Sequence, residues 1–292
     1  MIPSPITATA ADLPPAVVSA LHRPAPGLRS TTSAAGYSFS SFAWGDPGDR
    51  PLLLVHGATA SAATWWRMGP ALAASGRHVV APDLPGHGLT GGWRRRHRFV
   101  QTAADLASFV RAAGREQPDL EVIGHSWGGM VSAALPSVGL RPRVLVLVDP
   151  PALPLTYFEG YVRDPQEQPF ASLNEATAAL RVLNPAWVDG DVHAKAEGLT
   201  QFQVVAARSA LLGNGDWDAG LAALGDPAAD RVPVWYVKGE AATGSMIPDT
   251  FVPALAARVG TEHVLTIRDG EHSPQRQRPE ATLVAFLRAL GD

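Results

Sequence analysis

The sequence predicts an α/β protein built on a doubly wound, mostly parallel β-sheet. Short, almost wholly apolar runs recur along its 292 residues, and segments of helical length separate them. Strands that are buried on both faces, as in a parallel sheet, have this near-continuous apolar pattern. Their alternation with helices is typical of a doubly wound sheet. The runs are Pro51–Val55, His78–Pro82, Leu120–Ile123, Arg143–Val148, Val232–Val237 and His263–Ile267.

Helices are expected between these runs, and one more strand before them. Tyr37–Trp44 alternates apolar and polar residues and ends at a Gly-Asp-Pro-Gly turn, which indicates an antiparallel edge strand. We take residues 1–30 as an N-terminal arm, and residues 31–150 and 231–292 as the core of the domain. The expected helices are Trp65–Ser75, Val100–Gly114, Gly128–Val138, Pro248–Val259 and Pro279–Leu290.

One long gap interrupts the alternation of strands and helices. About eighty residues between Asp149 and Arg231 contain helical patterns but no convincing strand. The connection between two strands of such a sheet needs far fewer residues. We therefore expect residues 151–230 to form a helical cap, or lid, over the sheet. Its helical patterns are Leu173–Leu183, Asp191–Leu212 and Trp217–Leu224.

Composition excludes several classes of protein. The chain has 24 Lys and Arg against 27 Asp and Glu, a net charge of −3, which argues against nucleic acid as a partner. It has no cysteine, so a disulfide framework, a thiolate metal site and a cysteine nucleophile are excluded. No apolar run approaches the roughly 18 residues that span a bilayer, and the first residues lack the basic start of a secretory signal. We expect a cytoplasmic monomer or homodimer with no membrane partner.

Gly124, Ser126 and Gly128 form a Gly-x-Ser-x-Gly motif between the strand Leu120–Ile123 and a helix. A sharp turn from strand into helix holds the middle residue in a strained conformation, and small flanking residues let neighbouring backbone pass close. The serine hydroxyl is thereby presented at the edge of the sheet beside a helix N-terminus. The motif in this setting predicts a nucleophile at Ser126.

With this motif the chain resembles the α/β-hydrolase fold superfamily, from about Tyr37 to Leu290. Three further motifs occur in the family's order: His56–Thr59, where the family has its oxyanion loop; Asp83–Gly88, a structural hallmark; and Gly270–Pro274, where it carries its histidine. The resemblance implies a cap inserted after the sixth strand of the fold. It also implies a catalytic Ser126, with the backbone N–H groups of Ala58 and Trp127 as the oxyanion hole.

His272 is the expected base. It follows the last strand in a Gly-x-His turn, and imidazole is the side chain that exchanges protons near neutral pH. His56 is expected only to brace its loop. Ser126 also separates the chain from two relatives of this fold, the haloalkane dehalogenases and epoxide hydrolases, which use an aspartate nucleophile.

The acid departs from the family's common pattern. Most relatives place an aspartate in the loop that here contains Ala242 and Thr243. Asp149, at the end of the strand Val144–Val148, occupies an alternative acid position that zearalenone-type lactonases and some haloalkane dehalogenases use. The acid has only to accept a hydrogen bond from the histidine Nδ1–H group, so its place in the chain is free. We favour Asp149, with Glu240 and then Asp249 as alternatives.

These features together predict a serine hydrolase that cleaves a carboxylic ester or lactone through an acyl-enzyme intermediate. A carbon–carbon bond hydrolase and a cofactor-free perhydrolase would use the same residues. A ligand receptor that keeps the pocket without turnover is an alternative of another class. We expect a small apolar substrate in a mostly apolar pocket, with aromatic side chains such as that of Trp127 in its wall. No metal or organic cofactor is expected, because the chain has neither a His-Glu-x-x-His motif nor a phosphate-binding loop.

Overall fold

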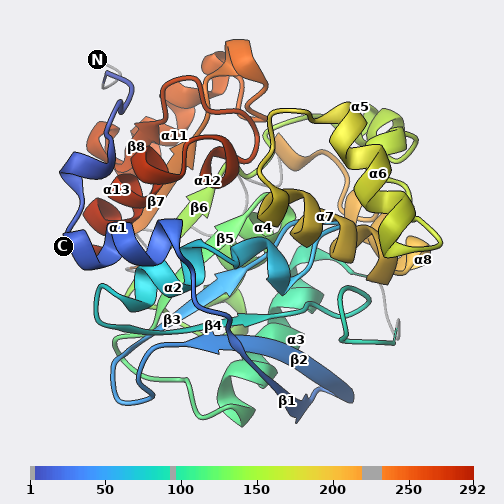
Figure 1. The fold of residues 1–292 in the computed structure, drawn as a ribbon, viewed down its shortest axis with the longest axis horizontal. Coiled ribbons are helices and arrows are strands. Elements are labelled where there is room, and N and C mark those ends of the chain that lie inside the picture. The colour runs from blue at the N-terminus through green and yellow to red at the C-terminus, as the bar shows by residue number, and fades with distance from the viewer. Residues whose placement is uncertain (1–3, 93–96, 219–231) are drawn as a thin grey trace.

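A computed structural model describes residues 4–92, 97–218 and 232–292 of the chain. A single eight-stranded sheet runs through the molecule in the order β1-β2-β4-β3-β5-β6-β7-β8 (Figure 1). The six strands β3 to β8 pair in parallel, which confirms the doubly wound, mostly parallel sheet. The strands are β1 (Leu28–Ala34), β2 (Tyr37–Trp44), β3 (Arg50–Val55), β4 (Arg77–Pro82), β5 (Glu121–His125), β6 (Val144–Val148), β7 (Val234–Lys238) and β8 (Val264–Thr266).

The edge of the sheet differs from the expectation. Tyr37–Trp44 is an antiparallel strand, β2, but it is not the edge strand, because β1 pairs with it along its whole length. Most residues of β1 are exposed polar side chains. A strand of this kind lacks the apolar alternation from which strands are predicted. The sequence therefore does not predict β1, whose first residues fall within the expected N-terminal arm.

Helices cover both faces of the sheet (Figure 1). Side chains of β3 alternate between the two cores: Leu53 and Val55 pack with α3, α4 and α11, whereas Leu52 and Leu54 pack with α1, α2 and α13. The helices are α1 (Pro15–His22), α2 (Met68–Ala73), α3 (Phe99–Ala112), α4 (Trp127–Ala133), α5 (Leu155–Tyr161), α6 (Leu173–Leu183), α7 (Asp189–Gln201), α8 (Val204–Leu212), α11 (Val252–Val259), α12 (Pro274–Gln277) and α13 (Pro279–Leu290).

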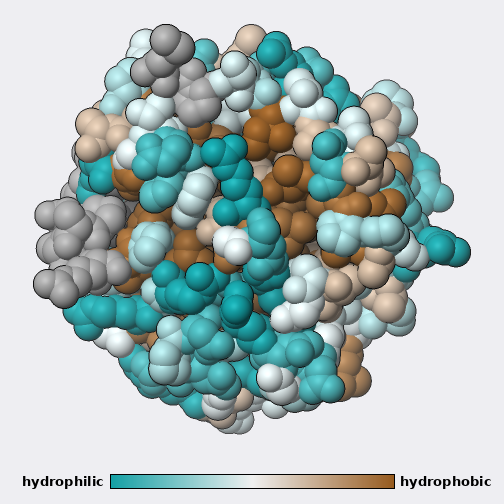
Figure 2. All heavy atoms as spheres, turned by 90° about the vertical axis from the view of Figure 1, so that its left-hand side faces the viewer, coloured by the Kyte–Doolittle hydropathy of each residue, from teal (hydrophilic) through white to brown (hydrophobic). Residues whose placement is uncertain are grey.

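The N-terminal segment packs on the core. Val17 and Leu21 of α1 are buried against the same core as α2 and α13. Ahead of α1, Ile6 forms a parallel bridge with Ile267, just beyond β8. On the side of the molecule that carries this segment, hydrophobic residues are bordered by hydrophilic ones (Figure 2). No helix in the described ranges has the length and apolar character required to cross a membrane.

Helices α5 to α8 lie between β6 and β7 in the chain and gather beside the sheet (Figure 1). Buried side chains of α6, α7 and α8 form a small core of their own, which includes Leu180, Val192 and Leu199. The expected helix Asp191–Leu212 is two helices, because the chain takes an extended conformation at Phe202. The expected helix Trp217–Leu224 lies outside the described residues beyond position 218. We refer to α5–α8 as the helical insertion.

Candidate active site

Ser126 occupies the sharp turn between β5 and α4. Its backbone has φ 55° and ψ −125°, a conformation that costs on the order of 1–3 kcal/mol in a residue with a side chain. The two glycines of the motif are required by close packing. A Cβ atom on Gly128 would lie 2.4 Å from the carbonyl oxygen of His56, and one on Gly124 would lie 2.5 Å from that of Gly128.

Ser126, His272 and Asp149 lie within hydrogen-bond distance of one another in series. His272 Nε2 is 3.0 Å from Ser126 Oγ, and His272 Nδ1 is 2.8 Å from Asp149 Oδ2. Asp149 is completely buried and also accepts hydrogen bonds from the Met246 N–H group and the Ser245 hydroxyl. With the Nδ1 proton donated to Asp149, the lone pair on Nε2 faces the serine hydroxyl. This is the arrangement of a nucleophile, a base and an orienting acid.

The two alternative acids bond elsewhere. Glu240 accepts a hydrogen bond of 3.0 Å from the Asp269 N–H group, and Asp249 pairs with Lys238. In the loop where most relatives have their acid, the Thr243 hydroxyl donates to the carbonyl oxygen of Gly270 at 2.6 Å. That loop therefore supports the chain just ahead of His272 without supplying it with a carboxylate.

The backbone N–H groups of Ala58 and Trp127 are the expected oxyanion hole. Ala58 borders the same cavity as Ser126, and Trp127 is the first residue of α4. In the described part of the chain, neither N–H group donates to an acceptor. Two unused donors beside a serine hydroxyl can stabilise the negative charge that develops on a carbonyl oxygen under attack.

Two buried histidines brace this geometry. His56 accepts a hydrogen bond from the Leu84 N–H group at 2.9 Å and donates to the carbonyl oxygen of Gly57 at 2.7 Å, which confirms its expected bracing role. His125 donates from Nε2 to the carbonyl oxygen of His272 at 2.9 Å. Burial lowers the pKa of both imidazoles, that of His125 well below its usual value, so both are neutral. The role of His125 was not predicted, although it adjoins Ser126.

A search of protein-family models matches residues 52–286 to the α/β hydrolase family. The chain belongs to this family. Among solved structures it is similar to E-2-(acetamidomethylene)succinate hydrolase, with a TM-score of 0.73 and 19% identity over 91% of this chain and all of that one. It is also similar to an epoxide hydrolase from Vigna radiata, with a TM-score of 0.70 and 15% identity over 90% and 97% of the two chains. At these identities the likeness shows the fold alone.

Curated relatives of this α/β hydrolase have different activities. It is 33% identical to epoxide hydrolase A of Mycobacterium tuberculosis over 38% of this chain and 34% of that one. It is 26% identical to the pimeloyl-[acyl-carrier protein] methyl ester esterase of Sodalis glossinidius over 84% of this chain and 93% of that one. The matches to the first curated relatives span only 34 to 41% of the length of those proteins.

A cavity of about 290 Å³ opens over Ser126 in the hydrolase. The expectation of an apolar wall is wrong, because side chains of the helical insertion and α12 make it largely polar. Trp127 is also not part of the wall: its side chain is fully buried in the core, where it packs on His87. Beside Gly57, Ala58, Ser126 and His272, the wall includes Tyr161, Gln166, Glu167, Asn184, Trp187, Lys195, Glu271, Arg276 and Gln277.

The helical insertion is tied to the oxyanion loop of the hydrolase by a buried ion pair. Lys195 of α7 donates to Glu167 at 2.6 Å and to the Thr59 hydroxyl at 3.2 Å, and Thr59 also bonds to Glu167. Burial lowers the pKa of Lys195, an effect that Glu167 opposes. Thr59 has a positive φ of 54° and follows Ala58 directly, so this ion pair fixes the loop that carries one oxyanion donor. No pattern in the sequence predicts this pair.

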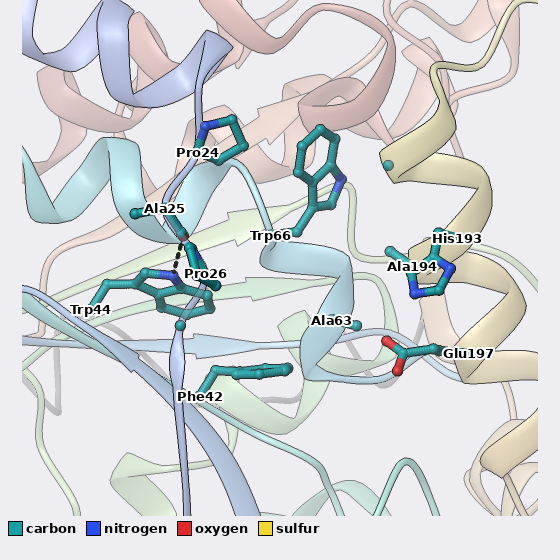
Figure 3. Close-up of a pocket in the computed structure, with 12 residues that line it drawn as sticks. Pro24, Ala25, Pro26, Phe42, Trp44, Ala63, Trp66, His193, Ala194 and Glu197 are labelled. Carbon is teal, nitrogen blue, oxygen red and sulfur yellow. Dashed lines mark hydrogen bonds between the residues drawn. The ribbon is translucent and has the colours of Figure 1, made fainter.

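A second cavity, of about 280 Å³, has none of Ser126, His272 and Asp149 in its wall, and Figure 3 draws the residues that line it. The chain around Pro24, β2, η2 (Ala62–Trp65) and α7 enclose it, and Trp44 donates from its indole to the carbonyl oxygen of Ala25. Its lining residues are Pro24, Ala25, Pro26, Gly27, Phe42, Trp44, Ala63, Trp66, Gly190, His193, Ala194 and Glu197.

Proposed function

We infer that this α/β hydrolase cleaves carboxylic esters or lactones through an acyl-enzyme on Ser126. The observation that carries this proposal is the hydrogen-bonded series Asp149–His272–Ser126 beside two unused backbone N–H groups. A serine hydroxyl is a weak nucleophile until a base takes its proton. We assign this role to His272, because its Nε2 atom is 3.0 Å from Ser126 Oγ.

In the first half of the reaction, Ser126 Oγ attacks the carbonyl carbon while His272 Nε2 takes the hydroxyl proton. The carbonyl oxygen becomes negative and accepts hydrogen bonds from the N–H groups of Ala58 and Trp127. Each such donor is worth about 10²–10³ in rate. His272 then gives its proton to the departing alkoxide oxygen, the ester bond breaks, and the acyl group remains on Ser126.

In the second half, water replaces the alcohol. His272 takes a proton from water as its oxygen attacks the acyl carbonyl, and the same two N–H groups hold the second oxyanion. The intermediate collapses to the carboxylic acid, and His272 returns the proton to Ser126. Asp149 keeps the imidazole in the required tautomer and stabilises its positive charge in both halves.

The similarity to epoxide hydrolases does not extend this reaction to epoxides. Attack by Ser126 on an epoxide carbon would form an ether between the serine and the opened ring. An ether has no carbonyl group for water to attack, so the enzyme would stay alkylated. The helical insertion fits the role of a cap, because its residues Glu167, Trp187 and Lys195 border the cavity over Ser126.

The proposal is tested by labelling with a fluorophosphonate, read by intact mass, and by hydrolysis of 4-nitrophenyl acetate. The wild type and Ser137→Ala, which removes an exposed serine, should be labelled once and turn over the ester. Ser126→Ala should not be labelled and should lose more than about 10⁴-fold in kcat. Labelling of folded Ser126→Ala would contradict the assignment. A folded wild type with neither label nor turnover would favour the receptor alternative.

A further inference from the structure

We propose that Arg276 is a specificity residue that binds a carboxylate on the substrate, so that the hydrolase acts on small esters or lactones of anionic acids. This inference rests on the proposed function, because it concerns the same cavity. Arg276 lies on α12, one helical turn after His272, and borders the cavity over Ser126.

The guanidinium group of Arg276 has unused hydrogen-bonding capacity. Among the described residues, no acceptor and no carboxylate in ion-pair contact takes any of its five N–H groups. Its face stacks on the indole of Trp187, 4.0 Å from the ring centroid, which fixes the plane of the group but satisfies none of its donors. A partly buried cation without an anionic partner is unfavourable until a ligand supplies one.

The acidic side chains nearby are already paired. Glu167 accepts from Lys195 and Thr59, and Asp191 pairs with Arg67 and with the indole of Trp66. Glu271, at the rim of the cavity, accepts from the Gln277 amide. Burial lowers the pKa of Arg276, while Asp191 and Glu167 act against that effect. Among the described residues that line this wall, Arg276 is therefore the cation that remains for a ligand.

The planar shape of the Arg276 guanidinium group restricts the chemical class of its ligand. A planar guanidinium whose faces are restricted by stacking offers its edge, where two parallel N–H groups match the two oxygens of a carboxylate. The cavity of about 290 Å³ is at the small end of ligand sites. A short acid ester with a second, free carboxylate meets both conditions: its carbonyl lies at Ser126 while its carboxylate reaches Arg276. This reverses the expectation of an apolar substrate.

A matched pair of ligands tests the proposal: monomethyl adipate and methyl hexanoate, which share the ester and a six-carbon acyl chain and differ in the terminal carboxylate. Binding is measured by calorimetry on the Ser126→Ala protein, so that turnover does not enter. We expect monomethyl adipate to bind at least tenfold more tightly than methyl hexanoate. Arg276→Gln in the same background should weaken its binding tenfold or more, as expected for loss of a charge-assisted pair.

Further variants distinguish the loss of a direct contact between Arg276 and the carboxylate from a change in net charge or a loss of folding. Arg278→Gln removes the same charge from an exposed position two residues along and should leave binding unchanged. Arg276→Lys should restore part of the affinity, since it keeps the charge without the fork geometry. In the serine-containing enzyme, Arg276→Gln should raise KM for monomethyl adipate by a larger factor than KM for methyl hexanoate.

Equal binding of the two esters, no binding of monomethyl adipate, or an equal loss in Arg276→Gln and Arg278→Gln would each overturn the proposal. None of these results would affect labelling at Ser126, which tests the hydrolase activity separately. Conversely, selective binding of the acid ester by a protein that fluorophosphonate does not label would keep the carboxylate site and reject the serine hydrolase.

Discussion

Two cavities of this molecule are nearly equal in volume, about 290 and 280 Å³, and opposite in character. Helix α7 borders both: Lys195 faces the cavity over Ser126, and its neighbour Ala194 faces the one between Trp44 and Trp66. One wall carries charged and amide side chains, and the other is built largely from proline, alanine and aromatic rings. The more apolar cavity has no nucleophile, base or oxyanion donor from the candidate site in its wall.

This contrast shows that volume and apolar character are weak guides to a reactive site. What distinguishes the cavity over Ser126 is backbone strain and unused hydrogen-bonding groups. Ser126 has a positive φ, and, within the described ranges, two N–H groups have no acceptor and Arg276 has no anionic partner. Such features cost stability and persist where they serve chemistry. We therefore expect substitutions around the cavity over Ser126 to change activity. Substitutions around the cavity between Trp44 and Trp66 should change stability.

The largest effect should come from Asp149→Asn. An amide can no longer hold the imidazole of His272 in the required tautomer, and we expect kcat to fall by roughly 10⁴-fold. The matched control is Glu240→Gln, which should change kcat less than about threefold, because the Glu240 carboxylate bonds to the Asp269 N–H group and to Arg268. Steady-state hydrolysis of 4-nitrophenyl acetate measures both. A large loss of kcat in Glu240→Gln with little change in Asp149→Asn would identify Glu240 as the acid that orients His272.

A pair of tryptophan substitutions compares the two walls directly. Trp44→Ala removes a buried indole and should lower the free energy of unfolding by about 3–5 kcal/mol, with kcat/KM of the folded enzyme unchanged. Trp187→Ala removes the ring that supports Arg276 and should reduce kcat/KM for an acid ester by roughly 3- to 10-fold, with little loss of stability. Urea unfolding and ester kinetics on both variants measure these effects. A loss of activity in Trp44→Ala alone would contradict the assignment of stability to one cavity and activity to the other.

A final effect concerns the dependence of stability on pH. Burial lowers the pKa of His97 to about 4, below the value near 6.5 of an unfolded chain. Between these values the unfolded state binds more protons, so stability is full above about pH 6.5 and falls as the pH drops towards 4, by about 1.4 kcal/mol per pH unit for this histidine. The buried imidazoles of His56, His87 and His125, whose pKa values burial also lowers, add to the slope.

Urea unfolding at pH 7.5, 6.0 and 5.0 measures this slope. His97→Gln should reduce it, whereas His193→Gln, which changes an exposed residue of the apolar cavity, should leave it as it is. A free energy of unfolding that stays constant from pH 7.5 to 5.0 would contradict the prediction, because it would mean that these histidines bind protons as readily in the folded protein as in the unfolded chain.

The predictable parts of this molecule are those that depend on residues close together in the sequence. Apolar runs such as Val144–Val148 identify buried strands, and Ser126 is recognisable from its glycines. The polar strand β1 was not predictable, because pairing with β2 and not a buried face holds it in place. Arg276 and Lys195 were missed for a related reason: their importance depends on which charges lie opposite them, and tertiary structure alone decides that.

The sequence predicted the acid of the candidate site only indirectly, and it did not predict the cavity wall. Asp149 could be chosen over Glu240 only because Ala242 and Thr243 replace the usual acid. The polar wall could not be anticipated, since the insertion is rich in Ala, Leu and Val along the chain. Only the tertiary structure brings its polar residues Gln166, Glu167, Asn184 and Lys195 to the wall of one cavity.

The ion pair between Lys195 and Glu167 limits how this scaffold can be re-engineered. Exchanging caps is an attractive route to new substrates, because the insertion leaves and re-enters the core at β6 and β7 alone. Here, however, both partners of the pair belong to the insertion, and their shared contact is Thr59 of the core. A grafted cap without an ammonium and a carboxylate at these places would release that threonine from its left-handed conformation. The transplant would then alter the catalytic machinery together with the specificity it was meant to change.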